Sequence, residues 1–244
     1  MLGLPDSVRA LLFDLDGVLT RTAALHARAW TETFDEFLRD HAERTGEPFV
    51  PFDPVAEYAA HVDGKQRVDG VRDFLGSRDI TLPTGTPTDS PERETLNGIG
   101  NRKNERVLRL ITSEGVEVFP GSVRYLDAAR EAGLPCAVVS SSANAALVLD
   151  VTGLEERIDV LVDGSVAHAL GLPGKPAPDT FLEATRRLGL APREAAVVED
   201  ALAGVAAGRA GGFGYVIGVD RLGQADALRE QGADIVVADL EELL

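Results

Sequence analysis

The sequence predicts an α/β fold in which a doubly wound, Rossmann-like parallel sheet carries an inserted all-α domain. Three observations predict it. From residue 118 onward, short apolar runs alternate with helical patterns, which is typical of parallel strands joined by crossover helices. An earlier run, Leu11, Leu12 and Phe13, is too apolar for a sheet edge. The stretch between them has helical periodicity and no strand pattern. We therefore expect a discontinuous core of residues 1–22 and 117–244, and a helical domain of residues 23–116.

Composition and charge exclude several classes of partner. The chain has 24 basic and 40 acidic residues, and its net charge of −16 argues against nucleic acid or an anionic membrane. The single cysteine, Cys136, excludes an internal disulfide and is interpreted as a small core residue. No apolar segment approaches the length of a membrane span, and the N-terminus has no signal-peptide pattern. We expect a cytoplasmic, unexported monomer.

The first apolar run ends abruptly at Asp14, and Asp16 follows two residues later. Alternation at the end of a strand places both carboxylates on one side, and Gly17 then permits a tight turn. Two ionised acids this close repel each other, so a cation such as Mg²⁺ or a shared proton would compensate. The alternative is that the two acids only cap and solvate the turn.

The helical domain shows one clear packing face. Apolar residues recur at i, i+4, i+7 and i+8 in Trp30, Phe34, Phe37 and Leu38. Short helices are predicted between residues 58 and 75. Residues 82–100 are rich in Pro, Thr and Gly and predict a long surface excursion, which a helix follows.

The second half of the chain predicts the remaining strands. They are expected at residues 136–140, 159–162, 195–198 and 215–219, with a last strand at residues 234–237 on an edge. Helices are expected to end at Gly133 and to begin after Asn144.

Polar residues that directly follow these strands are the candidates for a site, because the binding crevice of an open parallel sheet lies beyond the carboxyl ends of its strands. After residues 138–139 come Ser140, Ser141, Ser142 and Asn144, where hydroxyl and amide groups at a helix start can bind a phosphate oxygen. The alternative for this group is a simple helix cap.

Two later segments supply opposite charges. Lys175 lies in a segment that two prolines stiffen, which suits an ammonium held near a phosphoryl group, although a solvated loop lysine is the alternative. Glu199 and Asp200 again end an apolar strand with paired acids. Asp200 could be a helix cap, but two acid pairs at one sheet edge favour a metal site.

Taken in order, these motifs closely resemble the haloacid dehalogenase-like superfamily, and within it the β-phosphoglucomutase-like branch with an α-helical cap. The resemblance covers nearly the whole chain. It implies that Asp14 is the nucleophile that becomes an aspartyl phosphate and that Asp16 is the general acid/base. It also implies that Ser140 and Lys175 hold the transferring phosphoryl group. The implied Mg²⁺ ligands are Asp14, the backbone carbonyl of Asp16, Glu199 and Asp200.

The same resemblance implies that substrate choice lies in the cap, where a second phosphate grip is expected at Arg67 and Lys65. A solvated surface residue is the alternative for Arg67, and a core residue is the alternative for Trp30. The full set of implied substrate-binding residues is Thr22, His26, Trp30, Lys65, Arg67, Lys103, Ser141, Ser142 and Asn144.

The chain departs from the branch at Arg21, where an acid is usual, at Ala201, where Ser is usual, and in the excursion at residues 82–100. None of these departures removes a catalytic group, but they leave the identity of the sugar substrate undetermined. The resemblance implies a Mg²⁺-dependent sugar-phosphate mutase that interconverts β-glucose 1-phosphate and glucose 6-phosphate. The alternatives are a sugar-phosphate phosphatase and, more distantly, a receiver-like phospho-signalling domain, which the large cap and the Asp-x-Asp pair disfavour.

Overall fold

The computed structural model describes residues 2–244 and separates into two compact units. The first, which we call the sheet unit, comprises residues 2–22, Gly64–Gln66 and Val116–Leu244. The second, the helical unit, comprises Ala23–Asp63 and Arg67–Gly115. The short segment Gly64–Gln66 thus groups with the sheet unit, although it lies within the stretch expected to form the helical domain.

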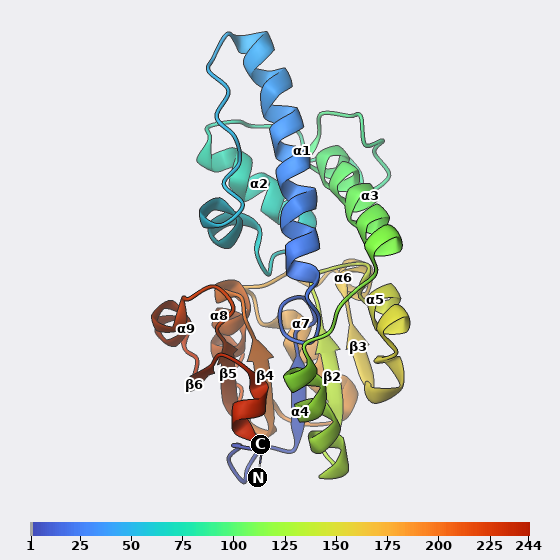
Figure 1. The fold of residues 1–244 in the computed structure, drawn as a ribbon, viewed down its shortest axis with the longest axis vertical. Coiled ribbons are helices and arrows are strands. Elements are labelled where there is room, and N and C mark those ends of the chain that lie inside the picture. The colour runs from blue at the N-terminus through green and yellow to red at the C-terminus, as the bar shows by residue number, and fades with distance from the viewer. Residues whose placement is uncertain (1) are drawn as a thin grey trace. The chain divides into compact units, whose positions relative to one another are not determined.

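The sheet unit contains a six-stranded parallel sheet with the order β3-β2-β1-β4-β5-β6 (Figure 1). The first strand, β1, lies between β2 and β4, and its residues are all buried, as the apolar run predicted. The last strand, β6, lies on an edge, which confirms that prediction too. The strands are β1 (Ala10–Phe13), β2 (Cys136–Val139), β3 (Val160–Val162), β4 (Ala195–Glu199), β5 (Tyr215–Val219) and β6 (Ile235–Val237).

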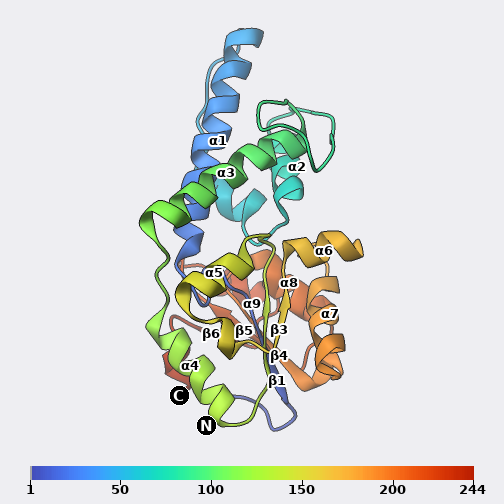
Figure 2. The same cartoon turned by 90° about the vertical axis from the view of Figure 1, so that its right-hand side faces the viewer.

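Helices cover both faces of this sheet (Figure 2). On one face, Leu12 and Val197 pack with Phe181 of α7 and Ala207 of α8. On the other face, the ring of Phe13 meets the ring of Tyr125 from α4 edge-on, with centroids 6.3 Å apart. Burial on both faces explains why the strands are continuous apolar runs without alternation. The helices are α4 (Pro120–Glu131), α5 (Ala145–Thr152), α6 (Gly164–Leu170), α7 (Asp179–Leu188), α8 (Leu202–Ala210) and α9 (Ala225–Gln231).

The register of the central strands brings their carboxyl ends to one edge. Leu11 pairs with Cys136 on one side and with Ala196 on the other. The amide of Asp14 continues the ladder by donating to the carbonyl of Val198 at 2.9 Å. The residues that directly follow β1, β2 and β4 therefore lie at neighbouring positions.

The helical unit is built around an apolar cluster. The predicted packing face of α1 (Thr22–Thr45) is confirmed, since its four apolar residues are buried. Phe34 stacks on Trp30 at 4.8 Å between centroids and lies 4.2 Å from Phe74 of α2 (Arg67–Ser77). A π-helical turn, η1 (Tyr58–Val62), and α3 (Leu96–Glu114) complete this unit. Across the described residues, no helix is both long and apolar enough to cross a bilayer.

The predicted excursion at residues 82–100 is wrong at its end, because α3 already begins at Leu96. Thr95 caps this helix, and its hydroxyl accepts a hydrogen bond from the amide of Gly98 at 2.9 Å. The hydroxyl of Thr95 in turn donates to Asp89, a buried carboxylate that also accepts from Thr86. The excursion is therefore shorter than predicted and is anchored by a buried acid.

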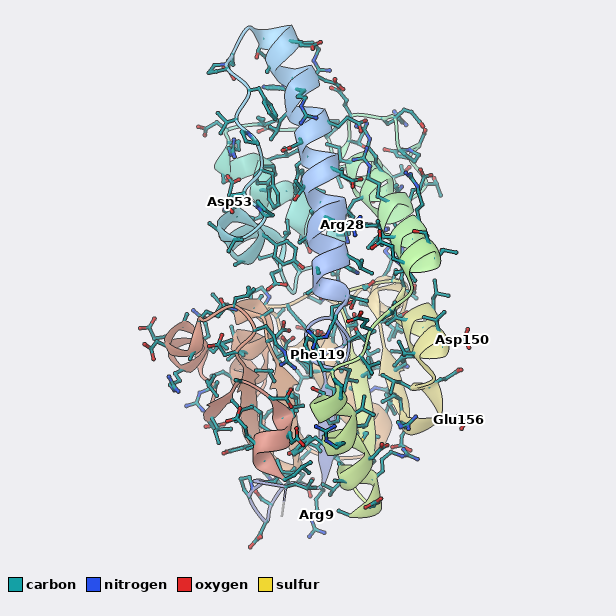
Figure 3. All side chains as sticks on the ribbon, in the orientation of Figure 1. Arg9, Arg28, Asp53, Phe119, Asp150 and Glu156 are labelled. Carbon is teal, nitrogen blue, oxygen red and sulfur yellow. The ribbon has the colours of Figure 1, made fainter. Side chains whose placement is uncertain are left out.

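Two segments of the sheet unit, residues 19–21 and 117–119, are hydrogen-bonded to each other. The amide of Arg21 donates to the carbonyl of Glu117 at 2.8 Å, and the amide of Phe119 donates to the carbonyl of Leu19 at 2.9 Å. The guanidinium of Arg21 lies 4.3 Å from the ring centroid of Phe119, which is labelled in Figure 3. These two segments form a short antiparallel ribbon.

Candidate active site

Three carboxylates meet at the carboxyl ends of β1 and β4. Asp14 follows β1, Glu199 ends β4, and Asp200 comes next. All three are buried, and each offers an oxygen that lies within 4.8 Å of the others. Asp14 of the first predicted acid pair thus lies close to both acids of the second pair, as expected from adjacent parallel strands.

Lys175 lies inside this cluster. Its ammonium donates to Asp14 Oδ1 and to Glu199 Oε1, each at 2.6 Å, and to the carbonyl of Val139 at 3.0 Å. The residue is 3% exposed, so it is not a solvated loop lysine. Burial by itself would lower the pKa of Lys175, but the two carboxylates outweigh it and raise that pKa above its ordinary value.

The cluster carries more negative charge than one lysine balances. Burial raises the pKa of Asp14 well above its ordinary value; Lys175 lowers it, but Glu199 and Asp16 raise it further. An all-oxygen donor set with surplus negative charge suits a hard divalent cation. The residues present therefore fit a divalent metal, with Asp14, Glu199 and Asp200 as the side chains that would hold it.

Two glycines allow these carboxylates to lie against the backbone. A Cβ on Gly17, whose φ is +96°, would lie 1.8 Å from Asp200 Oδ2. A Cβ on Gly204 would lie 1.8 Å from Glu199 Oε1. Any side chain at either position would displace a carboxylate of the cluster, so the glycines are part of the site's construction.

Asp16 is held differently from Asp14. Its Oδ1 accepts a hydrogen bond from the hydroxyl of Thr22, and its Oδ2 accepts one from the hydroxyl of Ser140 at 3.2 Å. The hydroxyl of Thr22 also lies 2.7 Å from that of Thr20. The carboxylate of Asp16 is not among the three clustered carboxylates.

The serine loop after β2 is shaped by its own hydroxyls. The hydroxyl of Ser140 accepts from the amide of Ser142 at 3.1 Å, and the hydroxyl of Ser142 accepts from the amide of Asn144 at 3.2 Å. Asn144 stands at the N-cap of α5, but its side chain makes no cap hydrogen bond. The hydroxyl of Ser141 donates to the carbonyl of Gly64 at 2.6 Å, which ties this loop to the segment that contains Lys65.

In the helical unit the structure brings three predicted residues together. The ammonium of Lys103 lies 2.9 Å from His26 Nδ1 and 5.0 Å from the ring centroid of Trp30. Because an ammonium can only donate, a charged Lys103 needs Nδ1 of His26 as its acceptor. Trp30 belongs to the apolar cluster, which agrees with the core interpretation of that residue.

Arg67 is the first residue of α2, and its stem packs on Gly100, where a Cβ would lie 3.1 Å from its Cγ. Burial lowers the pKa of Arg67, and no charged neighbour offsets that effect. Among residues 2–244 no carboxylate forms an ion pair with it. A partly buried, uncompensated guanidinium is a fitting anion contact.

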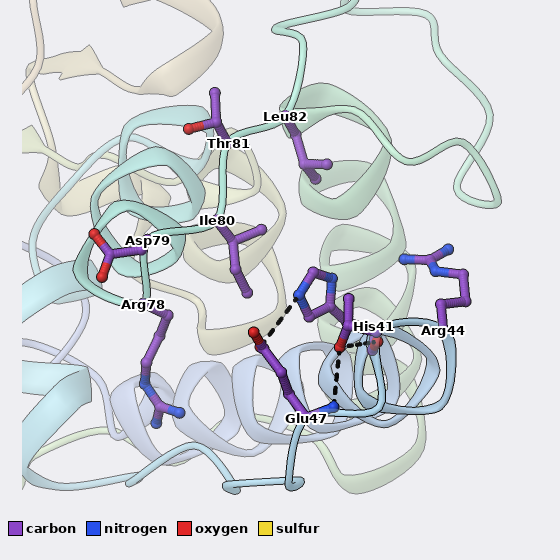
Figure 4. Close-up of a pocket in the computed structure, with 9 residues that line it drawn as sticks. His41, Arg44, Glu47, Arg78, Asp79, Ile80, Thr81 and Leu82 are labelled. Carbon is purple, nitrogen blue, oxygen red and sulfur yellow. Dashed lines mark hydrogen bonds and ion pairs between the residues drawn. The ribbon is translucent and has the colours of Figure 1, made fainter.

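A separate pocket of about 420 Å³ lies in the helical unit (Figure 4). Its lining includes His41, Arg44 and Arg78. Arg44 is paired with Glu94, and Arg78 is paired with Glu57. None of the predicted site residues lines it, so it is not the candidate active site.

Sequence reasoning missed two residues near the acid cluster. Arg221 donates to the carbonyl of Gly17 at 2.8 Å, and Gln224 donates to the carbonyl of Asp200 at 3.2 Å. Both side chains contact backbone atoms, which any residue type supplies, so no motif marks these contacts.

Comparisons with known proteins show the family to which the chain belongs. The family model for haloacid dehalogenase-like hydrolases matches residues 8–212. A β-phosphoglucomutase of Mycobacterium bovis is 57% identical over 247 residues, an alignment that covers all of this chain and 94% of that protein. Hexitol phosphatase A of Escherichia coli is 30% identical, and the alignment covers 96% of this chain and 93% of that protein.

A solved structure supports the fold independently. The β-phosphoglucomutase structure from Clostridium difficile superimposes with a TM-score of 0.74 at 24% identity, covering 97% of this chain and 93% of the other. At that identity the likeness concerns the fold alone. It agrees with a Rossmann-like parallel sheet accompanied by a helical insertion.

Proposed function

Because the chain belongs to the haloacid dehalogenase-like hydrolase family, we propose that it is a Mg²⁺-dependent β-phosphoglucomutase. The observation that carries the proposal is the buried Lys175 between Asp14 and Glu199, with Asp200 beside them. This combination supplies a nucleophile, a fixed positive charge and metal ligands at one point. The choice of β-glucose 1-phosphate as the substrate is supported by the 57% identity to the mycobacterial enzyme.

In this proposal a carboxylate oxygen of Asp14 attacks the phosphorus atom and forms an aspartyl phosphate. The reaction opposes negative charge on both the nucleophile and the substrate, so positive charge has to be fixed nearby. Lys175 supplies it, because its ammonium already touches Asp14 and cannot relax into solvent. When bound, Mg²⁺ would supply further charge neutralisation among Asp14, Glu199 and Asp200.

Asp16 is the proposed general acid/base. It would protonate the departing sugar oxygen and later deprotonate the hydroxyl that attacks the aspartyl phosphate. The hydroxyls of Thr22 and Ser140 hold one carboxylate oxygen each, which fixes the orientation of the group. A fixed carboxyl beside the nucleophile suits a proton transfer that must occur twice per turnover.

The residues of the helical unit are proposed to choose the substrate. Arg67 would bind the phosphate group that is not transferred, since its guanidinium has no carboxylate partner among residues 2–244. Lys103 and His26 form a fixed polar pair that suits sugar hydroxyls. Thr22, Trp30, Lys65, Ser141, Ser142 and Asn144 complete the proposed substrate-binding set.

A sugar-phosphate phosphatase is the second candidate, and the 30% identity to hexitol phosphatase A favours it. The two activities share the aspartyl phosphate and differ in the acceptor, which is water in one and a sugar hydroxyl in the other. We test them together by incubating the protein with Mg²⁺, β-glucose 1-phosphate and a trace of glucose bisphosphate. Glucose 6-phosphate and free phosphate are measured in the same samples.

A mutase produces glucose 6-phosphate with little free phosphate, whereas a phosphatase releases phosphate at the rate of substrate loss. Asp14→Asn should abolish both products without changing the circular dichroism spectrum, because an amide cannot act as the attacking anion. Substantial turnover in Asp14→Asn would contradict the assignment of the nucleophile.

Arg67→Ala tests the distal phosphate contact. Formation of aspartyl phosphate from acetyl phosphate should persist, because that donor has no second phosphate, whereas mutase turnover should fall by about thirty to a thousandfold, which corresponds to about 2 to 4 kcal/mol. The matched control is Arg72→Ala on the same helix, whose side chain is exposed and paired with Asp69. Equal loss of both activities in Arg67→Ala would instead indicate a folding role.

The wider setting is proposed as well. The enzyme would act in the cytoplasm as a monomer on a small sugar phosphate, without nucleic acid or membrane partners. Light scattering coupled to gel filtration should give the chain mass of 25.9 kDa, and twice that value would contradict the monomer.

A further inference from the structure

The loop between β5 and α9 holds both acid-bearing turns of the candidate site. Two of its side chains donate to main-chain carbonyls there: Arg221 Nε to Gly17 at 2.8 Å and Gln224 Nε2 to Asp200 at 3.2 Å. The first carbonyl belongs to the turn that follows Asp16, and the second belongs to a candidate metal ligand. One short loop therefore contacts the two turns whose spacing defines the site.

Arg221 is itself rigidly held. Its Nη1 donates to the carbonyl of Ala238 at 2.8 Å, and its Nη2 donates to the hydroxyl of Ser122 at 3.4 Å. The guanidinium lies 3.6 Å from the ring centroid of Phe119, and the side chain is 15% exposed. A planar, multiply bonded and stacked guanidinium fixes its acceptors in direction as well as in distance.

The loop is also ordered from within. Asp220 Oδ1 accepts from the amide of Gln224 at 2.8 Å and from that of Leu222 at 3.3 Å. The amide of Asp220 donates to the carbonyl of Val237 on β6 at 2.8 Å. These bonds anchor the loop to the sheet, so its two donors have a fixed base.

The two contacted turns touch each other at Gly17 and Asp200. The space where a Cβ of Gly17 would stand is occupied by the Asp200 carboxylate, at 1.8 Å from Oδ2. Any movement of the Gly17 turn therefore changes the room available to that carboxylate. Hydrogen bonds that hold the carbonyls of Gly17 and Asp200 therefore also restrict the position of the Asp200 carboxylate.

We infer that Arg221 and Gln224 are positioning residues that set the spacing between the Asp16–Gly17 turn and Asp200, and thereby the affinity of the acid cluster for a divalent cation. The inference rests on the proposed metal site. Arg221 and Gln224 hold that site in place, although neither residue belongs to the sequence motifs that predicted it. Groups that orient metal ligands without touching the metal typically affect metal affinity or activity by about 10 to 100-fold.

The test uses the full chain without substrate, with MgCl2 alone as the probe. Isothermal titration calorimetry gives the Mg²⁺ dissociation constant for wild type, Arg221→Lys and Gln224→Leu. Arg221→Lys keeps the charge but cannot reproduce three directed hydrogen bonds, so the dissociation constant should rise by about tenfold or more. Gln224→Leu removes one hydrogen bond and should raise it by less. The matched control is Arg229→Lys on α9, an exposed residue paired with Asp226, which should bind Mg²⁺ as wild type does.

Hydrogen exchange separates positioning from general destabilisation. In Arg221→Lys, amide exchange should become faster in residues 14–20 while β4 (Ala195–Glu199) keeps its protection. Faster exchange throughout the sheet would indicate a merely structural role and would overturn the inference, as would wild-type Mg²⁺ affinity in both variants. Asp200→Asn serves as the reference for the site itself. If Asp200→Asn loses Mg²⁺ affinity but Arg221→Lys and Gln224→Leu do not, the inference is wrong and the proposed metal site stands. If Asp200→Asn binds Mg²⁺ as wild type does, both the proposed metal site and the inference are wrong.

Discussion

Replacing Lys175 by Met removes the ammonium that pairs with two members of the acid cluster, Asp14 and Glu199. The lysine is 3% exposed and forms ion pairs of 2.6 Å with two carboxylates that are themselves buried. Methionine preserves much of the volume but leaves those carboxylates without their cation. Removing one partner of a buried ion pair typically lowers the free energy of unfolding by about 3 to 5 kcal/mol. For a chain of this length that corresponds to a fall of about 6 to 20 °C in the unfolding temperature.

The pH dependence of this loss follows from the direction of two pKa shifts. The pKa of Lys175 is raised in the folded protein, so its contribution to stability is complete at and below neutral pH and is lost only as the pH rises through the folded value. In Lys175→Met, the pKa of Asp14 stays raised by burial and by Glu199, with no ammonium to lower it. A carboxyl with a raised pKa favours the folded state when it is protonated. The difference in the free energy of unfolding between wild type and Lys175→Met should therefore become smaller as the pH falls from neutrality.

The assay is urea unfolding, followed by circular dichroism in metal-free buffer at several pH values. The control is Arg124→Met, which breaks an exposed ion pair with Glu241 and should cost no more than about 1 kcal/mol. A loss in Lys175→Met no larger than this control, or a difference that stays constant with pH, would refute the idea that Lys175 balances the charge of buried carboxylates.

Three further predictions concern single residues. Gly17→Ala should weaken Mg²⁺ binding at least tenfold in calorimetry, because the added Cβ would lie 1.8 Å from Asp200 Oδ2; unchanged affinity would contradict this packing. Cys136 is buried, and burial raises its pKa to about 12, so iodoacetamide at pH 8 should leave the native thiol intact and modify it only after unfolding, as mass spectrometry would show. Hydrogen bonds from Arg186 and its neighbour lower the pKa of Glu183 to about 2. The contribution of Glu183 to the stability of the folded state is therefore present above the pH range in which glutamate ordinarily titrates, and it is lost toward pH 2. At pH 6, Glu183→Gln should unfold at a lower temperature than wild type. The two melting curves should converge on acidification.

Much of the sheet could be predicted because strands buried on both faces must be apolar at every position. The runs at β4 and β5 are continuous, and their ends are marked by the first charged or polar residue. The same reasoning located Asp14 and Glu199, since they are the residues that end such runs. Parallel pairing then brings them together without any further information.

The predicted start of α3 is too late because the glycines of this helix resemble turn residues. A Cβ on Gly98 would lie 2.2 Å from the carbonyl oxygen of Arg93, so this glycine allows the excursion to pack closely on the helix and does not end it. Glycine is favoured both where two backbone segments pack closely and where the chain turns, and a single sequence does not distinguish these two causes. Likewise, the contacts of Arg221 and Gln224 end on backbone carbonyls, which leave no mark in the sequence.

The ribbon that joins Arg21 to Glu117 has a consequence for how the chain folds. Leu11 must find Cys136 and Ala196, partners so distant along the chain that closing the loop between them carries a large entropic cost and slows folding. If the helical unit folds first, its two ends are held near each other, because Arg28 near the start of α1 pairs with Glu114 at the end of α3. The connection from β1 to β2 then behaves kinetically as a short link. We expect a variant that destabilises only the apolar cluster around Phe34 to slow formation of the central strand pairs, although no residue of that cluster belongs to the sheet.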